Sequence, residues 1–112
     1  MAQDRTDVLQ GTLDVLVLKA LHHEPMHGWG ITERLEQWSA QTLLLGQGTL
    51  YPALYRLERQ GYIKSSWKLT ENNRKARYYA LTAAGRRHYD AECANWRRIS
   101  RAVNLILDTT PA

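Results

Sequence analysis

The side chains best suited to bind a polyanion gather in two neighbouring stretches of the chain, residues 47–59 and 72–77. In the first stretch, leucines at helical spacing leave polar and aromatic residues on the opposite side. Glutamine and arginine form paired hydrogen bonds with base edges, hydroxyls reach phosphates or a thymine methyl, and a helix N-terminus favours an anion. The candidate contacts are Gln47, Thr49, Tyr51, Pro52, Tyr55, Arg56 and Arg59. In an alternative reading, the ring of Tyr51 lies over Leu54 and Tyr55 and only its hydroxyl is wet.

The second stretch concentrates cations on a loop between two predicted strands. Its candidate contacts are Asn73, Arg74, Lys75 and Arg77. An arginine on such a ribbon suits a narrow minor groove, where the potential is most negative. The alternative is an ordinary polar hairpin turn, because asparagine tolerates positive φ and arginine keeps sheet edges soluble. A basic loop beside a polar-faced helix favours double-stranded DNA as the partner.

Other chemistry finds little support in the residue types. His23 and His27 have the spacing of metal ligands on a helix, but Pro25 between them breaks the helical register. Cys93 has no second cysteine to pair with, so a buried thiol is favoured over a nucleophile or redox sensor. The glycines of 46–48 lack the third glycine of a dinucleotide-binding turn. We therefore expect no catalytic residues, no metal and no cofactor, and no enzyme.

The composition describes one small folded unit. The chain has 112 residues, of which 44% are hydrophobic and 23% charged, and its net charge is +4. That modest total hides one basic segment, because residues 46–88 carry nine basic and two acidic groups. Its longest apolar run in the first half, residues 15–18, is far too short for a membrane span, and residues 1–7 lack the apolar stretch of a secretory signal. We expect a cytoplasmic protein with no membrane partner.

Hydrophobic spacing predicts three short helices, a hairpin and a long fourth helix. The predicted helices cover residues 8–21, 28–39, 49–60 and 83–107, with Gly46 to Gly48 as a turn, and the predicted strands cover 62–69 and 75–81. Thr82 is expected to cap the last helix, and Gly61 to end the third. The predicted fold is mainly α with a small β-hairpin. Residues 1–82 are expected to form a winged helix-turn-helix DNA-binding domain, and residues 83–112 a C-terminal dimerisation helix.

The last helix is expected to pair with its copy. The residues expected on its seam are Tyr89, Cys93, Trp96, Ile99, Val103 and Ile106. A homodimer of this kind sets two third helices about one DNA turn apart, which predicts an inverted-repeat operator. The alternative is a helix folded back on its own domain. For Trp96 two interpretations stay open, because an indole at a symmetric interface either stacks on a planar aromatic effector or only fills space.

Four ordered motifs resemble the PadR family of bacterial transcriptional regulators. They read LQGTLD at 9–14, EPMHGWGI at 24–31, QGTLYPALYRLERQGYI at 47–63 and YYALTAAGR at 78–86. This resemblance implies a homodimeric winged-helix repressor whose C-terminal helix supplies the dimer contact, and in some relatives an aromatic or other signal releases the DNA. It also implies that Thr49, Tyr51 and Pro52 begin the recognition helix, and that Trp96 lies where some relatives hold ligands.

Two departures from the family pattern affect what the resemblance implies. Many relatives carry a Gly-Arg-Pro type wing, whereas residues 71–77 here read ENNRKAR. We also expect no second C-terminal domain after Ala112, so an effector pocket is expected at the dimer interface. The function expected from the sequence is a sequence-specific, dimeric DNA-binding repressor. The alternatives are a winged helix that binds only protein, and a small-molecule-binding dimer built around Trp96.

Overall fold

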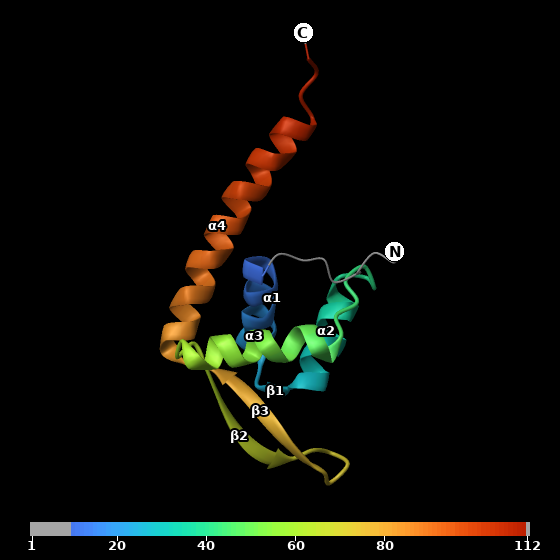
Figure 1. Cartoon of the computed structure of the whole chain (residues 1–112), viewed down its shortest axis with the longest axis vertical. Helices are drawn as coiled ribbons and strands as arrows, with labels where there is room; N and C mark the ends of the chain where they lie inside the picture. Colours follow the sequence, from blue (N-terminus) through green and yellow to red (C-terminus); the bar gives the residue numbers. More distant parts are fainter. Residues whose placement is uncertain (1–9, 112) are drawn as a thin grey trace.

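The computed structural model describes residues 10–111, which form four helices and a three-stranded antiparallel sheet (Figure 1). The helices are α1 (Gln10–His23), α2 (Gly28–Trp38), α3 (Gln47–Arg59) and α4 (Ala83–Leu107), and the strands are β1 (Met26–His27), β2 (Ile63–Leu69) and β3 (Lys75–Leu81). This order confirms the predicted mainly α fold with a β-hairpin. The strand β1 was not predicted, because two residues are too few to show a periodic pattern. It pairs with β3 through Met26 opposite Tyr79.

The core lies where α1, α2 and α3 meet the base of the sheet. Leu18 of α1, Ile31 of α2 and Leu57 of α3 are fully buried there. Apolar residues on several sides of α1 are covered, which confirms the prediction of a helix buried on more than one side. Trp38 was expected on the buried stripe of α2 but is 45% exposed. As the last residue of that helix, it packs edge-on against His23 instead.

Several helix and strand boundaries differ from the prediction. Helix α1 continues to His23, two residues further than expected, while the predicted residues 8 and 9 lie outside the described chain. Helix α3 begins at Gln47 because Gly46 takes the extended N-cap conformation, so the predicted turn at 46–48 is wrong. It ends at Arg59, one residue before the predicted end, and Gly61 follows as the predicted stop. There Gly61 has a φ of +82°, which only glycine adopts without strain.

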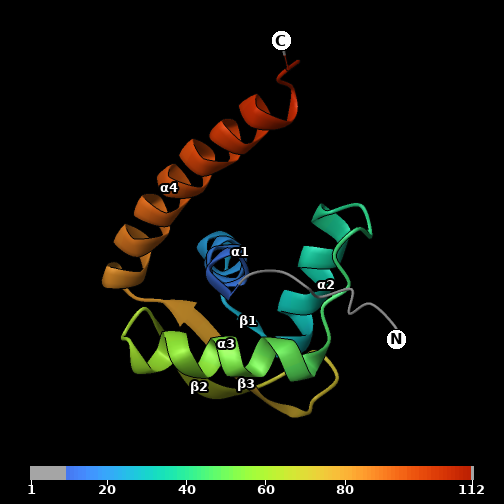
Figure 2. The ribbon, with the colours of Figure 1, turned by 45° about the horizontal axis from the view of Figure 1, so that its top comes forward.

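A tight joint connects the end of α3 to the start of α4. Thr82 caps α4 as predicted, because its hydroxyl accepts a hydrogen bond from the Gly85 backbone N–H at 3.0 Å. The same hydroxyl donates to the Gly61 carbonyl at 2.6 Å, and the Thr82 N–H donates to the Tyr62 carbonyl at 3.1 Å. A Cβ added at Gly85 would stand 1.9 Å from that Tyr62 oxygen. The direction of α4 is therefore fixed relative to α3 (Figure 2).

The β2–β3 ribbon and the far end of α4 extend from opposite ends of the body (Figure 1). At the base of the ribbon Ile63, Tyr79 and Leu81 are buried, and the last two were predicted to face the core. The predicted alternation of burial along β2 stops there, because Trp67 and Leu69 are 62% and 63% exposed. The ribbon runs beyond the core, so neither of its faces is covered near the tip. None of the described helices combines the length and apolarity needed to cross a membrane.

Candidate nucleic-acid interface

The outward face of α3 carries the side chains expected to bind. Leu50, Leu54 and Leu57 pack inward as predicted, with 1% exposure or less. On the opposite side Tyr51 and Tyr55 are 48% and 63% exposed. Pro52 and Arg59 are also exposed, whereas Gln47 and Thr49 are half-buried at the start of the helix. The Arg59 guanidinium lies 5.7 Å from the centre of the Tyr55 ring, so these two residues form one cationic and aromatic surface.

The first turn of α3 is held against α2. A Cβ added at Gly28 would stand 2.8 Å from the Tyr51 hydroxyl oxygen, so the tyrosine reaches across to the start of α2. In the alternative from the sequence, the Tyr51 ring lies over Leu54 and Tyr55, whereas in the structure the end of the ring contacts Gly28. Gln47 Nε2 donates a hydrogen bond to Thr32 Oγ1 at 2.9 Å, which adds a second link between the two helices. The side chains at the N-terminal end of α3 are thus positioned by α2.

Arg56 faces the body of the protein. Its Nη2 lies 2.7 Å from the Asp14 carboxylate of α1, and its buried Nε has no hydrogen-bond partner among the described residues. Burial raises the pKa of the Asp14 carboxyl, and the attraction of the Arg56 guanidinium offsets only part of that rise. The prediction that Arg56 is left toward solvent beside Tyr51 and Tyr55 holds only in part, because its side chain is 30% exposed and paired with Asp14. Its residue type and spacing could not reveal the carboxylate that α1 brings beside it.

The loop between β2 and β3 is organised by Thr70. Its N–H donates to the Arg74 carbonyl at 2.7 Å, and its hydroxyl accepts from the backbone N–H groups of Asn72 and Arg74 at 3.2 Å each. Asn73 has a φ of +62°, a conformation that asparagine tolerates. The side chains of Arg74 and Lys75 are exposed on this frame. The loop therefore presents two cations from a defined turn.

A groove of about 700 Å³ separates this loop from the start of α2 and from Tyr51. The wall formed by the ribbon includes Arg74, Lys75 and Arg77. The wall formed by α2 includes Trp29, which is 61% exposed and was not among the predicted contacts. The EPMHGWGI motif contains this tryptophan, and its place beside two glycines at a helix start was the signal that could have marked it. Glu33 and Glu71 also line the groove, so its three cations leave a small positive excess. A positive surface of this kind suits a polyanion.

The two halves of α4 differ in what they contact. Near its start, the Tyr89 ring lies 4.9 Å from the His22 ring and packs against the core. Burial and the neighbouring Cys93 raise the pKa of the Tyr89 phenol to about 12. This half of α4 therefore folds back on α1, and Tyr89 is partly buried within its own chain. Its predicted place on the seam between two copies stays a prediction. Cys93 is half-buried beside Tyr89.

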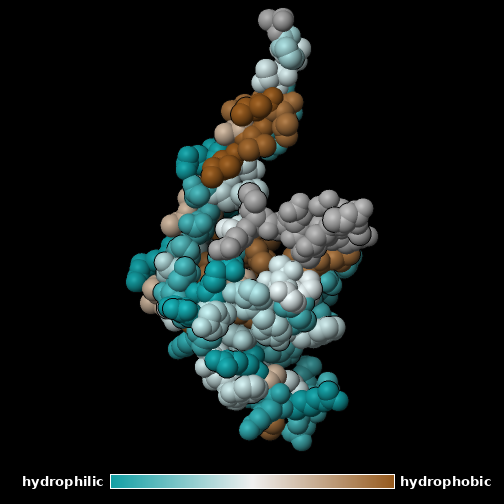
Figure 3. Space-filling model, in the orientation of Figure 1, coloured by the Kyte–Doolittle hydropathy of each residue, from teal (hydrophilic) through white to brown (hydrophobic). Residues whose placement is uncertain are grey.

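From Trp96 onward the helix leaves the body and exposes apolar side chains. Trp96, Ile99 and Val103 are 42–47% exposed, and Leu105, Ile106 and Leu107 are 67–73% exposed. Figure 3 shows these last residues as a continuous hydrophobic end of α4, in contrast to the hydrophilic ribbon at the opposite end. A shallow hollow of about 210 Å³ lies between α1 and α4, where Leu16, Cys93 and Trp96 contribute to its lining. An exposed apolar face of this kind marks a contact with another molecule.

The two histidines with metal-like spacing serve different local contacts. His27 Nδ1 accepts a hydrogen bond from the Gly30 N–H at 3.0 Å and so caps α2. His23 packs against Trp38, as described above. Within residues 10–111, no three histidine, cysteine or acidic side chains come together as a metal site.

Three helices followed by a ribbon beside the third helix define the winged helix-turn-helix class. The model of the Transcriptional regulator PadR-like family matches residues 17–91, and the chain belongs to this family. It is a transcriptional regulator and not an enzyme.

Similar proteins support both the fold and the family. The chain is 30% identical to a structurally characterised transcriptional regulator from Clostridium thermocellum, covering 88% of this chain and 95% of that one, with a TM-score of 0.78. A PadR family regulator from Eggerthella lenta is 32% identical, covers 90% and 86% of the two chains and gives a TM-score of 0.76. A transcriptional regulator of Mycobacterium tuberculosis is 36% identical over 72 residues, which span 62% of this chain and 64% of that protein.

Proposed function

We propose that the chain acts as a homodimeric, sequence-specific DNA-binding repressor at an inverted-repeat operator. The observation that carries this proposal is the separation of two surfaces on one small body. Grooves lined by cations and aromatic rings lie between the ribbon and the starts of α2 and α3, and an apolar helix end lies on the far side (Figures 1 and 3). The first surface suits duplex phosphate and base edges, and the second suits a second copy of the chain.

In the proposed complex, the N-terminal end of α3 enters the major groove. The residues proposed to face the bases or the adjoining backbone are Gln47, Thr49, Tyr51, Pro52, Tyr55 and Arg59. Asn73, Arg74 and Lys75 on the loop contact the backbone or the minor groove. Arg56 holds α3 against α1 through Asp14, so we give it a positioning role.

The proposed dimer uses α4 from Trp96 onward. Ile99, Val103 and Ile106 recur at three or four residues, which is the spacing of a helical seam. Because the joint at Thr82 and Gly85 fixes α4 relative to α3, pairing the tails also sets the separation of the two α3 helices. A separation of roughly 34 Å fits successive major grooves on one side of the duplex. Repression is the proposed action because blocking a promoter requires only DNA binding.

The salt dependence of DNA binding tests this proposal. Fluorescence anisotropy measures the affinity for a duplex selected from genomic fragments and for a random duplex. Both affinities should fall as salt rises. Neutralisation of about six phosphates should lower affinity by about 10³ between roughly 50 and 200 mM salt. The selected duplex should bind more tightly than the random one at each salt concentration. Binding that is weak and independent of salt for both duplexes would favour a winged helix that binds only protein.

We also propose that Trp96 contacts an aromatic effector at the dimer interface. The indole is 47% exposed and borders the hollow between α1 and α4. Planar aromatic molecules should quench the fluorescence of the wild type and of Trp29→Phe, but should quench Trp96→Phe less. Equal quenching of both variants would exclude Trp96 as the contact and leave it as packing.

A further inference from the structure

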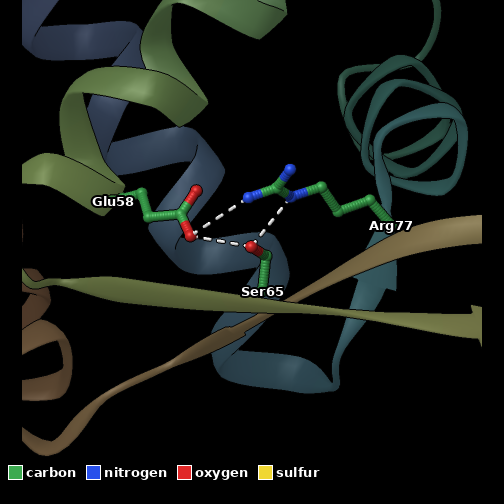
Figure 4. A network of polar contacts seen from close by, with 3 residues as sticks. All are labelled: Glu58, Ser65 and Arg77. Carbon is green, nitrogen blue, oxygen red and sulfur yellow. Dashed lines mark hydrogen bonds and ion pairs between the residues drawn. The ribbon is translucent and has the colours of Figure 1, made fainter.

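The ribbon is tied to α3 by a polar bridge of three side chains. Ser65 Oγ of β2 donates to Glu58 Oε2 of α3 at 2.7 Å and accepts from Arg77 Nε of β3 at 2.9 Å (Figure 4). Arg77 Nη2 also lies 3.6 Å from Glu58 Oε2. The single hydroxyl proton is directed at the carboxylate, which leaves an oxygen lone pair for the guanidinium. Each of the three side chains thus forms a hydrogen bond or an ion pair with both of the others.

The bridge lies on the surface proposed to meet DNA. Glu58 and Arg77 line a groove of about 650 Å³ together with Tyr51, Tyr55 and Arg59. Glu58 is one of two acidic residues in the basic segment 46–88, and the other, Glu71, is on the exposed loop. An isolated carboxylate at this position would repel phosphate. Paired with Arg77, it cancels one cation of the surface instead.

Folding stability gives only a weak reason for this arrangement. The side chains of Arg77 and Glu58 are 47% and 33% exposed, and ion pairs with that much solvent access contribute little to the free energy of folding. The position of the bridge along the ribbon gives a stronger reason. Arg77 lies outward of the buried Tyr79, where Trp67 opposite it is already exposed. The bridge therefore ties the uncovered part of the ribbon to α3.

We propose that Glu58 determines the specificity of the DNA-binding surface by holding Arg77 in this bridge. The bridge fixes the angle between the wing and α3, and it withholds one cation from phosphate. Non-specific affinity comes almost entirely from neutralised phosphates, whereas specific affinity also needs α3 and the wing in one geometry. Glu58 and Ser65 are accordingly positioning residues that act through Arg77. This inference rests on the proposed DNA-binding function.

The test uses the full chain with Glu58→Gln, Arg77→Gln and the double variant. Glutamine at 58 keeps an oxygen that accepts from Ser65 but removes the charge that holds Arg77. Glu58→Gln should steepen the slope of log affinity against log salt on random duplex by about 0.9, the value for one added phosphate contact. It should raise random-duplex affinity about fivefold near 0.15 M salt and lower the ratio of selected to random binding. Adding Arg77→Gln should return the slope and the random-duplex affinity to the wild-type values, because the freed cation is then absent. The ratio of selected to random binding should stay low in the double variant, because the bridge is still broken.

Glu71→Gln is the matched control. It removes the same charge from the same basic segment but leaves the bridge intact, so its effect should be the same with and without Arg77→Gln. Thermal unfolding of every variant checks that the fold is retained.

The outcomes separate the bridge from the DNA-binding function. If the wild type binds DNA but Glu58→Gln leaves the random-duplex slope and the selectivity unchanged, the inference about the bridge is overturned. A slope in the double variant that lies about 0.9 below the wild-type slope also overturns it, because Arg77 then already contacts phosphate in the wild type. A wild type that binds no duplex at any salt concentration overturns the proposed function itself.

Discussion

The groove between α3 and the ribbon and the far half of α4 are both exposed, but they are built in opposite ways. In the groove, charged side chains such as Arg77 are held by neighbours within the chain. Along α4 from Ile99 to Leu107, apolar side chains are 42–73% exposed on a helix that has left the body. A preorganised polar surface suits a ligand with fixed geometry, whereas an uncovered apolar face suits burial against another such face. The contrast supports the proposal that the first region binds DNA and the second pairs with another copy of the chain.

The largest expected effect comes from placing a charge on the apolar face. Val103→Asp should convert the dimer to a monomer, because a carboxylate buried without a partner costs on the order of 3 kcal/mol or more. Analytical ultracentrifugation measures the change. Asn104→Asp introduces the same charge one residue away, outside the seam of Ile99, Val103 and Ile106, and should leave the dimer in place.

The same pair of variants can contradict the proposed role of the apolar face of α4. If Val103→Asp sediments as the wild type does, or if Asn104→Asp dissociates equally, then the apolar seam is not the self-association surface.

The next effect concerns the groove. Tyr51→Ala should weaken binding to the selected duplex by about 1 to 3 kcal/mol while the fold stays intact. Tyr51→Phe keeps the ring and removes only the hydroxyl, so the difference between the two variants separates ring contact from hydrogen bonding. Anisotropy titrations measure both, and an unchanged preference for the selected duplex in Tyr51→Ala would remove this residue from the reading surface.

A smaller effect is expected from the residue that positions Tyr51. Gly28→Ala places a methyl group 2.8 Å from the present position of the Tyr51 hydroxyl oxygen, so the ring must shift. The affinity for the selected duplex should fall by less than the Tyr51→Ala loss, on the order of 1 kcal/mol. Gly11→Ala, where nothing lies within 4 Å of the added carbon, is the control. Equal affinities for these two variants would mean that the Gly28 contact does not position Tyr51 for binding.

The smallest effect tests the link between α1 and α3. Because burial raises the pKa of Asp14 above its ordinary value of 3.8, the folded state holds the proton more firmly than the unfolded state. The free energy of unfolding of the wild type, relative to Asp14→Asn, should therefore fall as the pH rises from below 3.8 through the raised pKa, and then stay constant. Denaturant unfolding between about pH 3 and about pH 7 measures it. A difference that grows with pH would show that the attraction of Arg56 outweighs burial.

Sequence periodicity was sufficient to predict the helices, the hairpin and the long last helix. The leucines of α3, the cap at Thr82 and the stop at Gly61 are local signals, and the structure agrees with each. The strand β1 carried no such signal, because its two residues become a strand only by pairing with β3. The start of α3 was predicted two residues too late, at Thr49, because Gly46 serves as the N-cap and not as part of a turn.

The candidate site was less predictable, because a side chain's partner depends on distant parts of the chain. Arg56 and Arg77 have the residue type and position of DNA contacts, but Asp14 is 42 positions away from the first, and Glu58 is 19 positions from the second. Trp29 was missed for the converse reason, since it comes beside the groove only when α2 packs against α3. Tyr89 has the helical spacing of the predicted seam, and its spacing alone could not show that it also packs against the core of its own chain.

The central claim is that two chains joined through α4 place two α3 helices and two wings on one face of a duplex. Hydroxyl-radical footprinting of the wild type on a selected operator tests it most directly. The proposed dimer predicts two protected patches related by an inverted repeat, with their centres about 10 base pairs apart. A single protected patch, or protection without inverted symmetry, would contradict the claim.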